Sequence, residues 1–183
     1  PAVLRDMLRY STNLTTECVG LTASGAAGLE ASGRAMSDWV RATFGVEFDL
    51  RDHSGLGGAS RVKAAGMARV LVQAGREGRG LQPILRDVGM KDDEGKVVEG
   101  HPVKVLAKSG TLNFVSGLAG HVMPPPAAKS GRELVFAIFS GDPARRDAVP
   151  VSLREAPEGA KSWTRRARRL QGQLVSRWAG AHG

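Results

Sequence analysis

The sequence predicts an α/β protein in which helices come first, and an antiparallel sheet covered by a last helix follows. Three observations indicate this order. Apolar residues recur at helical spacing through most of residues 2–75. Three strand-like runs then follow one another within residues 103–141, and loops rather than helices separate them. Residues 163–178 return to apolar steps of three and four, as in an amphipathic helix.

The N-terminal part predicts four helices. Residues 2–22 have roughly helical apolar spacing, but the small polar residues of "YSTN" interrupt it. We therefore expect a helix, a break near Ser11–Asn13 and a second helix. Residues 29–44 predict a third helix, and residues 61–75 predict a fourth, for which Ser60 is the expected N-cap.

The strand candidates differ in their patterns. Residues 46–52 alternate as a short strand does, and residues 103–110 and 113–123 form two longer runs. Residues 133–141 are almost continuously apolar, which predicts a central strand. The proline-rich residues 124–132 predict a long hairpin loop, since proline cannot donate to a sheet ladder. The apolar face of the last helix, with its arginines outward, is expected at Trp163, Ala167, Leu170, Leu174 and Trp178.

The composition is that of a globular domain, with 42% hydrophobic and 24% charged residues. No apolar run approaches the ~20 residues that cross a bilayer, so we expect no transmembrane segment. Cys18 is the single cysteine, which excludes an internal disulfide. The four histidines are widely separated, and we expect neither a metal nor another cofactor. The net charge of +8 favours anionic partners, such as nucleic acid, acidic lipid headgroups or anionic cell-wall polymer.

Two short polar clusters interrupt otherwise packable elements: "YSTN" at residues 10–13 and "KSGT" at residues 108–111. Each has a simple structural interpretation, the first as a turn that breaks a helix and the second as a solvated strand end. In this order, however, S-x-N and K-S-G match the paired S-D-N and K-T-G triads of penicillin-binding proteins and serine β-lactamases.

With these motifs the chain resembles the low-molecular-weight class C penicillin-binding proteins, the D-alanyl-D-alanine carboxypeptidase/endopeptidase group. "DHSGLG" at residues 52–57 is similar to the D-G-S-G-L segment of that family, and residues 108–122 resemble its K-T-G strand and the following turn. The resemblance covers nearly the whole chain. It implies a serine β-lactamase/DD-peptidase-like fold, an antiparallel sheet flanked by helices, in which residues 1–183 are the C-terminal part of a single penicillin-binding domain.

The resemblance implies a role for each residue of the two motifs. Ser11 would relay a proton to the leaving D-alanine nitrogen, and Asn13 would hydrogen-bond the substrate amide. Lys108 would supply positive charge near Ser11 and near the C-terminal carboxylate of the substrate.

The rest of the second motif would bind the substrate. Ser109 would donate a hydrogen bond to the carboxylate, and Gly110 would let the substrate backbone lie close to the strand because it has no Cβ. The N–H of Thr111 would form one half of an oxyanion hole.

The chain departs from the family pattern in two ways. K-S-G replaces K-T-G, a mild change that keeps the hydroxyl. The nucleophile motif S-x-x-K should precede S-x-N, but residues 1–10 contain none. "SRVK" at Ser60–Lys63 has the S-x-x-K pattern, but it follows S-x-N instead of preceding it, and its residues suit the start of a helix. We therefore do not assign the nucleophile to it. We therefore expect a C-terminal fragment that lacks the first strands and the nucleophile helix and is inactive without the N-terminal part of the same protein.

The resemblance thus predicts a serine-type D-Ala-D-Ala carboxypeptidase/endopeptidase that cleaves peptidoglycan stem peptides through an acyl-enzyme, binds β-lactam antibiotics and is periplasmic. The alternative is a non-catalytic peptidoglycan- or β-lactam-binding module that has lost the nucleophile. A nucleic-acid-binding protein is a third reading, suggested by the arginine-rich last helix. One tyrosine and five phenylalanines offer little for base stacking, so we expect no nucleic-acid partner.

Overall fold

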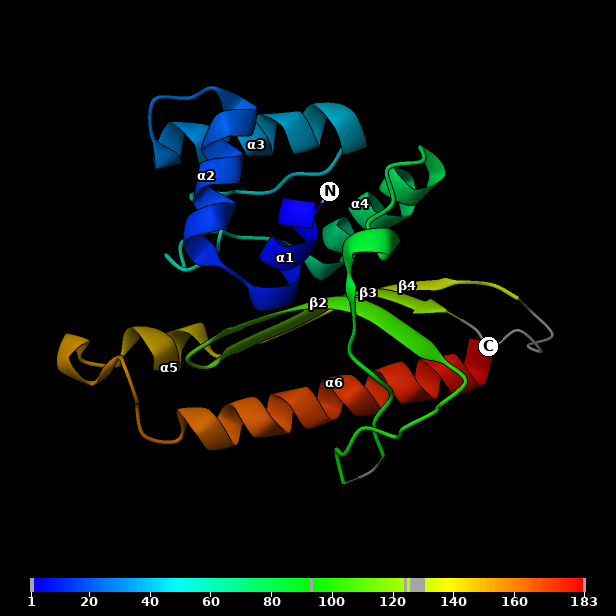
Figure 1. Cartoon of the computed structure of the whole chain (residues 1–183). Coiled ribbons are helices and arrows are strands. Elements are labelled where there is room, and N and C mark those ends of the chain that lie inside the picture. The colour runs from blue at the N-terminus through cyan, green and yellow to red at the C-terminus, as the bar shows by residue number, and fades with distance from the viewer. Residues whose placement is uncertain (1, 93, 124, 126–130, 183) are drawn as a thin grey trace. The chain divides into compact units, whose positions relative to one another are not determined.

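A computed structural model describes residues 2–92, 94–123, 125 and 131–182 (Figure 1). The chain divides into two compact units, Pro1–Arg86 and Asp87–Gly183, and each is described by itself. The first unit is helical and the second contains most of the sheet and the last helix. This order of elements confirms the predicted α/β class with helices first.

The described helices of the first unit match the predicted ones closely. The break between the first two helices is confirmed, because Ser11 takes a left-handed backbone conformation (φ 53°) between them. The N–H of Thr12 closes the first helix on the carbonyl of Met7 at 3.3 Å. The elements are α1 (Ala2–Tyr10), α2 (Asn13–Ser24), α3 (Leu29–Phe44), α4 (Ala64–Arg76) and the 3-10 turn η1 (Gln82–Ile84).

Two expectations for the first unit are wrong. Residues 46–52 form no extended strand but a single bridge between Asp49 and Arg61. Ser60 does not cap α4, which begins at Ala64 after Lys63. The Ser60 hydroxyl instead accepts from the N–H of Arg51 at 3.0 Å and donates to Asp52 at 3.1 Å, so it stabilises the preceding loop. The core of this unit consists of Val40, Phe44, Val46, Phe48 and Ala74.

A four-stranded sheet in the order β1-β2-β3-β4 organises the second unit. Its strands are β1 (Arg86–Asp87), β2 (Lys104–Leu112), β3 (Val115–Met123) and β4 (Leu134–Gly141). The last three are the predicted strands, and both of their pairings are antiparallel. β4 was predicted to be central, but it lies at one edge of the sheet in the part of the chain that the structure describes. Most of the predicted loop 124–132 lies outside the described residues.

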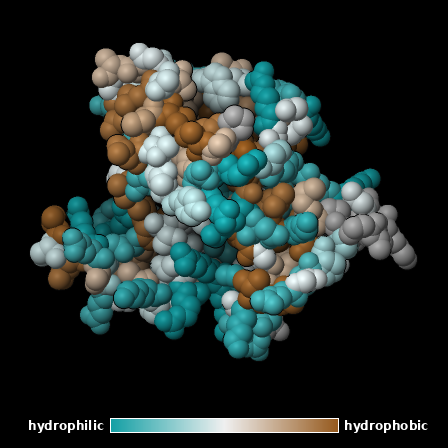
Figure 2. Space-filling view, viewed as in Figure 1, coloured by the Kyte–Doolittle hydropathy of each residue, from teal (hydrophilic) through white to brown (hydrophobic). Residues whose placement is uncertain are grey.

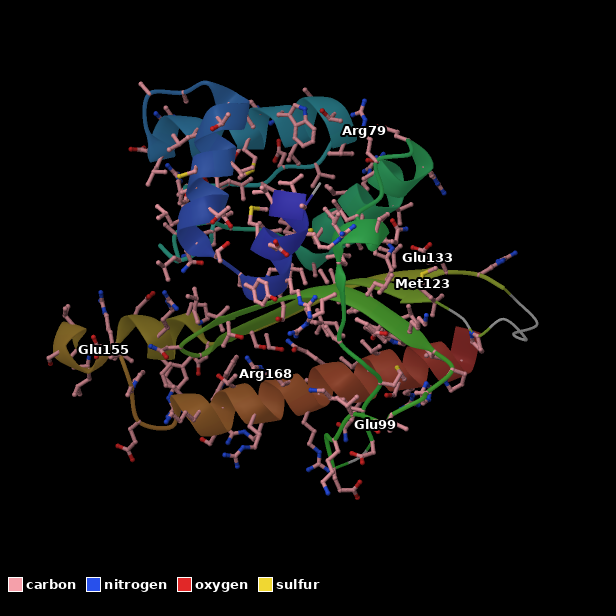
Figure 3. The ribbon with its side chains drawn as sticks, in the orientation of Figure 1. Arg79, Glu99, Met123, Glu133, Glu155 and Arg168 are labelled. Carbon is pink, nitrogen blue, oxygen red and sulfur yellow. The ribbon has the colours of Figure 1, made fainter. Side chains whose placement is uncertain are left out.

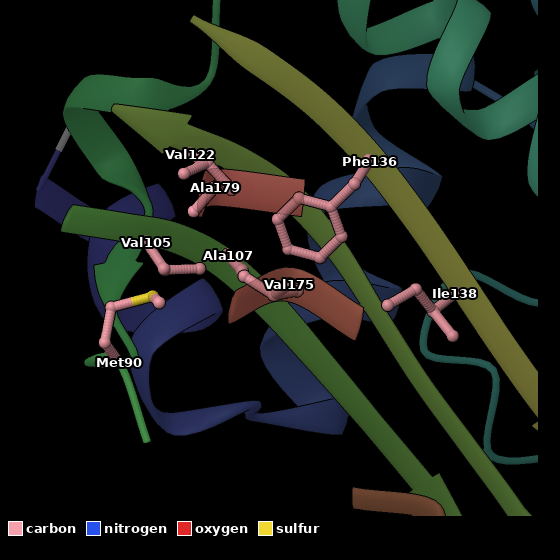
Figure 4. Close-up of a cluster of buried hydrophobic side chains, with 8 residues drawn as sticks. All are labelled: Met90, Val105, Ala107, Val122, Phe136, Ile138, Val175 and Ala179. Carbon is pink, nitrogen blue, oxygen red and sulfur yellow. The ribbon is translucent and has the colours of Figure 1, made fainter. Parts of the chain in front are cut away.

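Helix α6 (Ala160–His182) packs on one face of this sheet, as expected, and α5 (Pro143–Asp147) and the 3-10 turn η2 (Val151–Leu153) precede it. Residues of β2, β3 and β4 meet α6 in one apolar cluster (Figure 4): Met90, Val105, Ala107, Val122, Phe136, Ile138, Val175 and Ala179. Leu170 was expected on the apolar face of α6 but is 50% exposed. The buried residue next to it is Gln171.

Candidate functional site

Ser11 and Asn13 lie together at the junction of two helices. Ser11 follows the last residue of α1, and Asn13 is the first residue of α2, with both side chains exposed. A left-handed conformation is uncommon for a residue other than glycine, asparagine or aspartate, and such residues cluster at functional sites. The turn between α1 and α2 therefore presents a serine where glycine would be conformationally easier.

The carboxylate of Glu17 joins α2 to the segment 52–57. Its oxygens accept from the N–H of His53 at 3.1 Å and from the N–H of Ser54 at 2.9 Å. Burial tends to raise the pKa of Glu17, but hydrogen bonds from Ser54 and His53 outweigh it, so the pKa is lowered. Asp52 closes the same segment by accepting from the N–H groups of Gly55 and Gly57 at 3.1 and 2.8 Å. The structure thus joins α2, the helix that begins at Asn13, to the family-like segment 52–57.

A buried serine–histidine pair supports this arrangement, and the sequence did not predict it. The hydroxyl of Ser32 lies 2.6 Å from Nε2 of His53 and 2.6 Å from the hydroxyl of Ser24. Gly20 leaves room for the imidazole, because a Cβ there would come within 2.1 Å of the ring. Ser32 is completely buried, so this pair fastens α2, α3 and the loop together and does not present a nucleophile.

Lys108, Ser109, Gly110 and Thr111 lie in the second half of β2, before the hairpin that leads into β3. Val105 and Ala107 pack against α6, and side chains alternate along a strand. Lys108 and Gly110 therefore lie on the face of the sheet away from α6. Ser109 and Thr111 lie on the α6 side.

The backbone of this segment faces an open edge of the sheet. The N–H of Val88, next to β1, donates to the carbonyl of Val105 at 2.9 Å, so Val105 directs its backbone groups away from β3. Along an antiparallel strand, every second residue does the same, which includes Ser109 and Thr111. β1 has only two residues and covers only the start of β2. The N–H of Thr111 therefore points to an edge that no described strand covers, and the Lys108 ammonium donates to the carbonyl of Ser109 there.

Helix α6 holds this hairpin through two polar side chains that the sequence did not single out. Nη2 of Arg168 donates to Oγ1 of Thr111 at 2.9 Å, and Figure 3 labels Arg168 on α6. Gln171 donates to the carbonyl of Ser116, which lies opposite Thr111 in the register of β2 and β3, at 3.0 Å. Arg168 is exposed, as expected for the arginines of α6, and it makes this contact at the surface. No motif or apolar periodicity in the sequence predicts a contact for either residue. The sequence shows only that the two residues lie about one turn apart on the helix.

The predicted site residues therefore form two groups. Ser11 and Asn13 belong to the first unit, and residues 108–111 belong to the second. Within each group the predicted residues are neighbours along the chain, and in the second group Lys108 and Gly110 lie on one face of the sheet while Ser109 and Thr111 lie on the other. Among the residues that the structure describes, no three histidine, cysteine, aspartate or glutamate side chains are grouped so as to hold a metal ion. In the same residues, no helix has the length and apolarity needed to cross a bilayer.

Residues 1–157 match the model of the D-Ala-D-Ala carboxypeptidase 3 (S13) family. The chain belongs to this family. The S13 match covers S-x-N, the 52–57 segment and K-S-G-T, and so confirms the resemblance on which those motifs were selected. No protein with a curated description matches the chain.

Solved structures with the same fold are penicillin-binding and peptidoglycan-cleaving proteins. The penicillin G-acylated predatory endopeptidase Bd3459 from Bdellovibrio bacteriovorus, in complex with an immunity protein, has a TM-score of 0.66 at 18% identity. The match covers 99% of this S13 chain and 45% of that chain. Bd0816 from the same organism has a TM-score of 0.64 at 18% identity, with 98% and 43% covered.

A mutant of PBP-A, solved as an acyl-enzyme complex with penicillin G, has a TM-score of 0.60 at 17% identity, with 96% of this chain and 61% of that chain covered. The S13 chain thus spans less than half of the Bdellovibrio endopeptidases and about three fifths of PBP-A. These structural similarities confirm the predicted DD-peptidase-like fold. The chain corresponds to part of that domain.

Proposed function

We propose that the protein is a serine-type D-Ala-D-Ala carboxypeptidase/endopeptidase that acts on peptidoglycan peptides through an acyl-enzyme. The S13 family and the penicillin-acylated neighbours support a peptidoglycan-acting serine peptidase. The observation that carries the finer proposal is the open edge of β2. There the N–H of Thr111 and the ammonium of Lys108 lie on one short stretch of strand.

In the proposed reaction, a serine hydroxyl attacks the carbonyl of the terminal D-Ala-D-Ala bond. The carbonyl oxygen becomes an oxyanion that accepts from the N–H of Thr111, a donor of the kind that contributes ~3 kcal/mol to the transition state. The C–N bond then breaks, and the leaving nitrogen takes the proton that the attacking hydroxyl has lost, which Ser11 relays. Water attacks the resulting ester, and its cleavage returns the enzyme and a shortened peptide.

Binding of the substrate would use the remaining residues of the two groups. The C-terminal carboxylate of the peptide lies next to Lys108 and accepts from the hydroxyl of Ser109. The substrate backbone runs along Gly110, and Asn13 hydrogen-bonds its amide. With these roles, residues 1–183 would be the C-terminal part of a single penicillin-binding domain.

The nucleophile is proposed to lie in the N-terminal part of the same protein, so residues 1–183 alone would be inactive. The surfaces of α1 and α2 support a covering segment: neither helix has a fully buried residue, and Val3 and Leu14 are 61% and 78% exposed. Burying such side chains would stabilise a complex with the missing part. A periplasmic location goes with this activity, since the substrate is cell-wall peptide.

The test is covalent labelling of the intact protein with a fluorescent penicillin, followed by a denaturing gel. The acyl-enzyme proposal predicts a labelled band that unlabelled penicillin removes and that Lys108→Ala weakens strongly. Digestion of purified muropeptides then separates the two activities, since a carboxypeptidase releases D-alanine and an endopeptidase converts cross-linked dimers to monomers. Binding of penicillin without a covalent band would instead support the non-catalytic module.

A further inference from the structure

A groove of about 1040 Å³ lies in the second unit, on the α6 side of the sheet. The end of the β2–β3 hairpin, the first half of α6, the segment before it and the loop around residue 94 form its walls. Figure 3 labels Arg168 on α6 and Glu155 on the segment before it, and both line the groove. Pockets for drug-sized ligands are ~300–1,000 Å³, so this groove suits a peptide rather than a single ion.

The groove carries a concentrated positive charge that the fold itself does not neutralise. Lys161, Arg165 and Arg169 follow one another at four-residue steps on α6, so they share one face, and Figure 2 shows hydrophilic side chains gathered along this helix. With Lys91 and Arg168 they make five cationic side chains in the lining. Among the described residues, none of the five pairs with a carboxylate within 4 Å.

The position of Lys161 on α6 is also unfavourable for the isolated helix. Lys161 lies in the first turn, where the helix macrodipole is positive, and this turn contains no acidic residue. A cation there opposes the dipole, so helix stability does not account for Lys161, and internal ion pairing accounts for none of the five cations in the described part of the chain. A bound anion would be stabilised by the side chains and by the dipole together.

The lining also distinguishes between kinds of anion. Glu94 and Glu155 lie in the same walls, and none of the lining residues is aromatic. Two carboxylates would repel the uniform charge of a nucleic acid, and its bases would find no ring for stacking. Peptidoglycan stem peptides carry several carboxylates and a few amines. Arginine forks bind carboxylates in bidentate pairs, and the glutamates suit an amine.

We propose that this groove binds the carboxylates of a second, non-reacting stem peptide and so holds the enzyme on polymeric peptidoglycan. The proposal rests on the proposed function, because it assumes that the substrate is part of this polymer. The groove adjoins the candidate reaction edge and takes in only part of it: Lys108 and Gly110 lie on the opposite face of the sheet, whereas Ser109 and Thr111 lie on the α6 side. Thr111 is shared, since its hydroxyl faces Arg168 in the groove while its N–H points to the edge.

The test is co-sedimentation of the intact protein with purified sacculi after its active site has been blocked with penicillin. Arg165→Glu with Arg169→Glu reverses two groove charges and leaves Arg168 and Thr111 in place. Arg166→Glu with Arg177→Glu is the matched control, since both residues are exposed on α6 outside the lining and the net charge changes equally. We expect sacculus affinity to fall about tenfold in the groove variant and little in the control.

Two further measurements decide the ligand and separate this proposal from the proposed function. Sacculi whose carboxylates have been amidated should bind the wild-type protein as weakly as the groove variant binds native sacculi. Equal binding of both variants to native sacculi, undiminished binding to amidated sacculi, or groove-dependent retention on DNA in place of sacculi would overturn the proposal. Acylation by penicillin reports on the proposed function alone, and we expect the groove variant to acylate at the wild-type rate.

Discussion

Gln171 of α6 is hydrogen-bonded twice to Ser116 of β3: its Nε2 lies 3.0 Å from the carbonyl oxygen of Ser116 and 3.2 Å from the hydroxyl. Both residues are buried, at 3% and 1% exposure. Ser116 is the cross-strand partner of Thr111, and Thr111 is hydrogen-bonded to Arg168, one turn before Gln171 on the helix. A polar contact in an otherwise apolar interface thus fixes the position of α6 beneath the hairpin that carries K-S-G-T.

Replacing Gln171 by leucine should therefore destabilise the protein. The substitution leaves the buried hydroxyl of Ser116 without its partner, which costs about 1–3 kcal/mol. Urea unfolding of the intact protein measures this cost. Adding Ser116→Ala removes the unpaired hydroxyl and should restore part of the lost free energy of unfolding. Strictly additive effects of the two substitutions would contradict the contact between Gln171 and Ser116.

Two substitutions of Ser11 separate the effect of its backbone conformation on stability from the effect of its hydroxyl on acylation. Ser11→Gly and Ser11→Ala both remove the hydroxyl, but only glycine takes a φ of 53° without cost. The glycine variant should be more stable than the alanine variant by about 1 kcal/mol, as measured by thermal unfolding. If Ser11 relays the proton, both variants should acylate with penicillin equally slowly. Wild-type acylation in either variant would remove Ser11 from the mechanism.

Gly110 offers a test of substrate approach with little structural cost. A Cβ at Gly110 would meet no atom within 4 Å and its φ is not left-handed, so Gly110→Ala should fold with wild-type stability or slightly better. Fluorescent penicillin labelling should nevertheless fall, because the methyl group would occupy the space that the ligand backbone needs.

Gly120→Ala is the control for Gly110→Ala, because the same substitution on the neighbouring strand should lower stability. A Cβ at Gly120 would lie 2.1 Å from the carbonyl oxygen of Leu106 and 2.6 Å from Cα of Ala107. This variant should lose about 1–3 kcal/mol of stability, since the two strands must move apart. Undiminished labelling of Gly110→Ala would mean that the substrate does not run along this residue.

The lowered pKa of Glu17 predicts an acid-sensitive link between α2 and residues 52–57. Hydrogen bonds favour the ionised carboxylate in the folded protein, so its contribution to stability is present above the unfolded value of about 4.5 and is lost as the pH falls through the lower folded pKa. Glu17→Gln should be less stable than the wild type near neutral pH, and the difference should shrink in acid. Chemical denaturation as a function of pH measures it.

The exposed residue Glu158 provides the control for this pH series. Glu158→Gln should keep the wild-type dependence of unfolding on pH. If Glu17→Gln also kept it, the hydrogen bonds from His53 and Ser54 would not be contributing to stability.

The helices were predictable because their apolar residues repeat with the period of a helix over many turns. The two motifs were recognisable because their order along the chain is specific. The errors have physical causes as well. The apolarity of residues 133–141 reports burial of side chains and does not report how many strands lie beside β4.

Apolar periodicity and motif order could not predict the polar contacts of α6. Periodicity assigns a buried position to an apolar residue, so it selected Leu170 and passed over Gln171, whose burial depends on a hydrogen bond to a distant strand. Arg168 is exposed as predicted, but its hydrogen bond to Thr111 was not foreseen, since the two residues lie 57 positions apart. The closeness of Ser32 and His53 depends on the packing of α3 against the loop that contains His53, which no local sequence pattern predicts.

The short length of β1 has a consequence for handling the protein. An uncovered strand edge with free backbone donors and acceptors is a template on which a second molecule can add its own strand, the first step toward aggregates. Lys104 and Lys108 lie four residues apart on the same face of β2, and lysines on an edge strand oppose such pairing through mutual repulsion. Neutralising them should make concentrated solutions turbid.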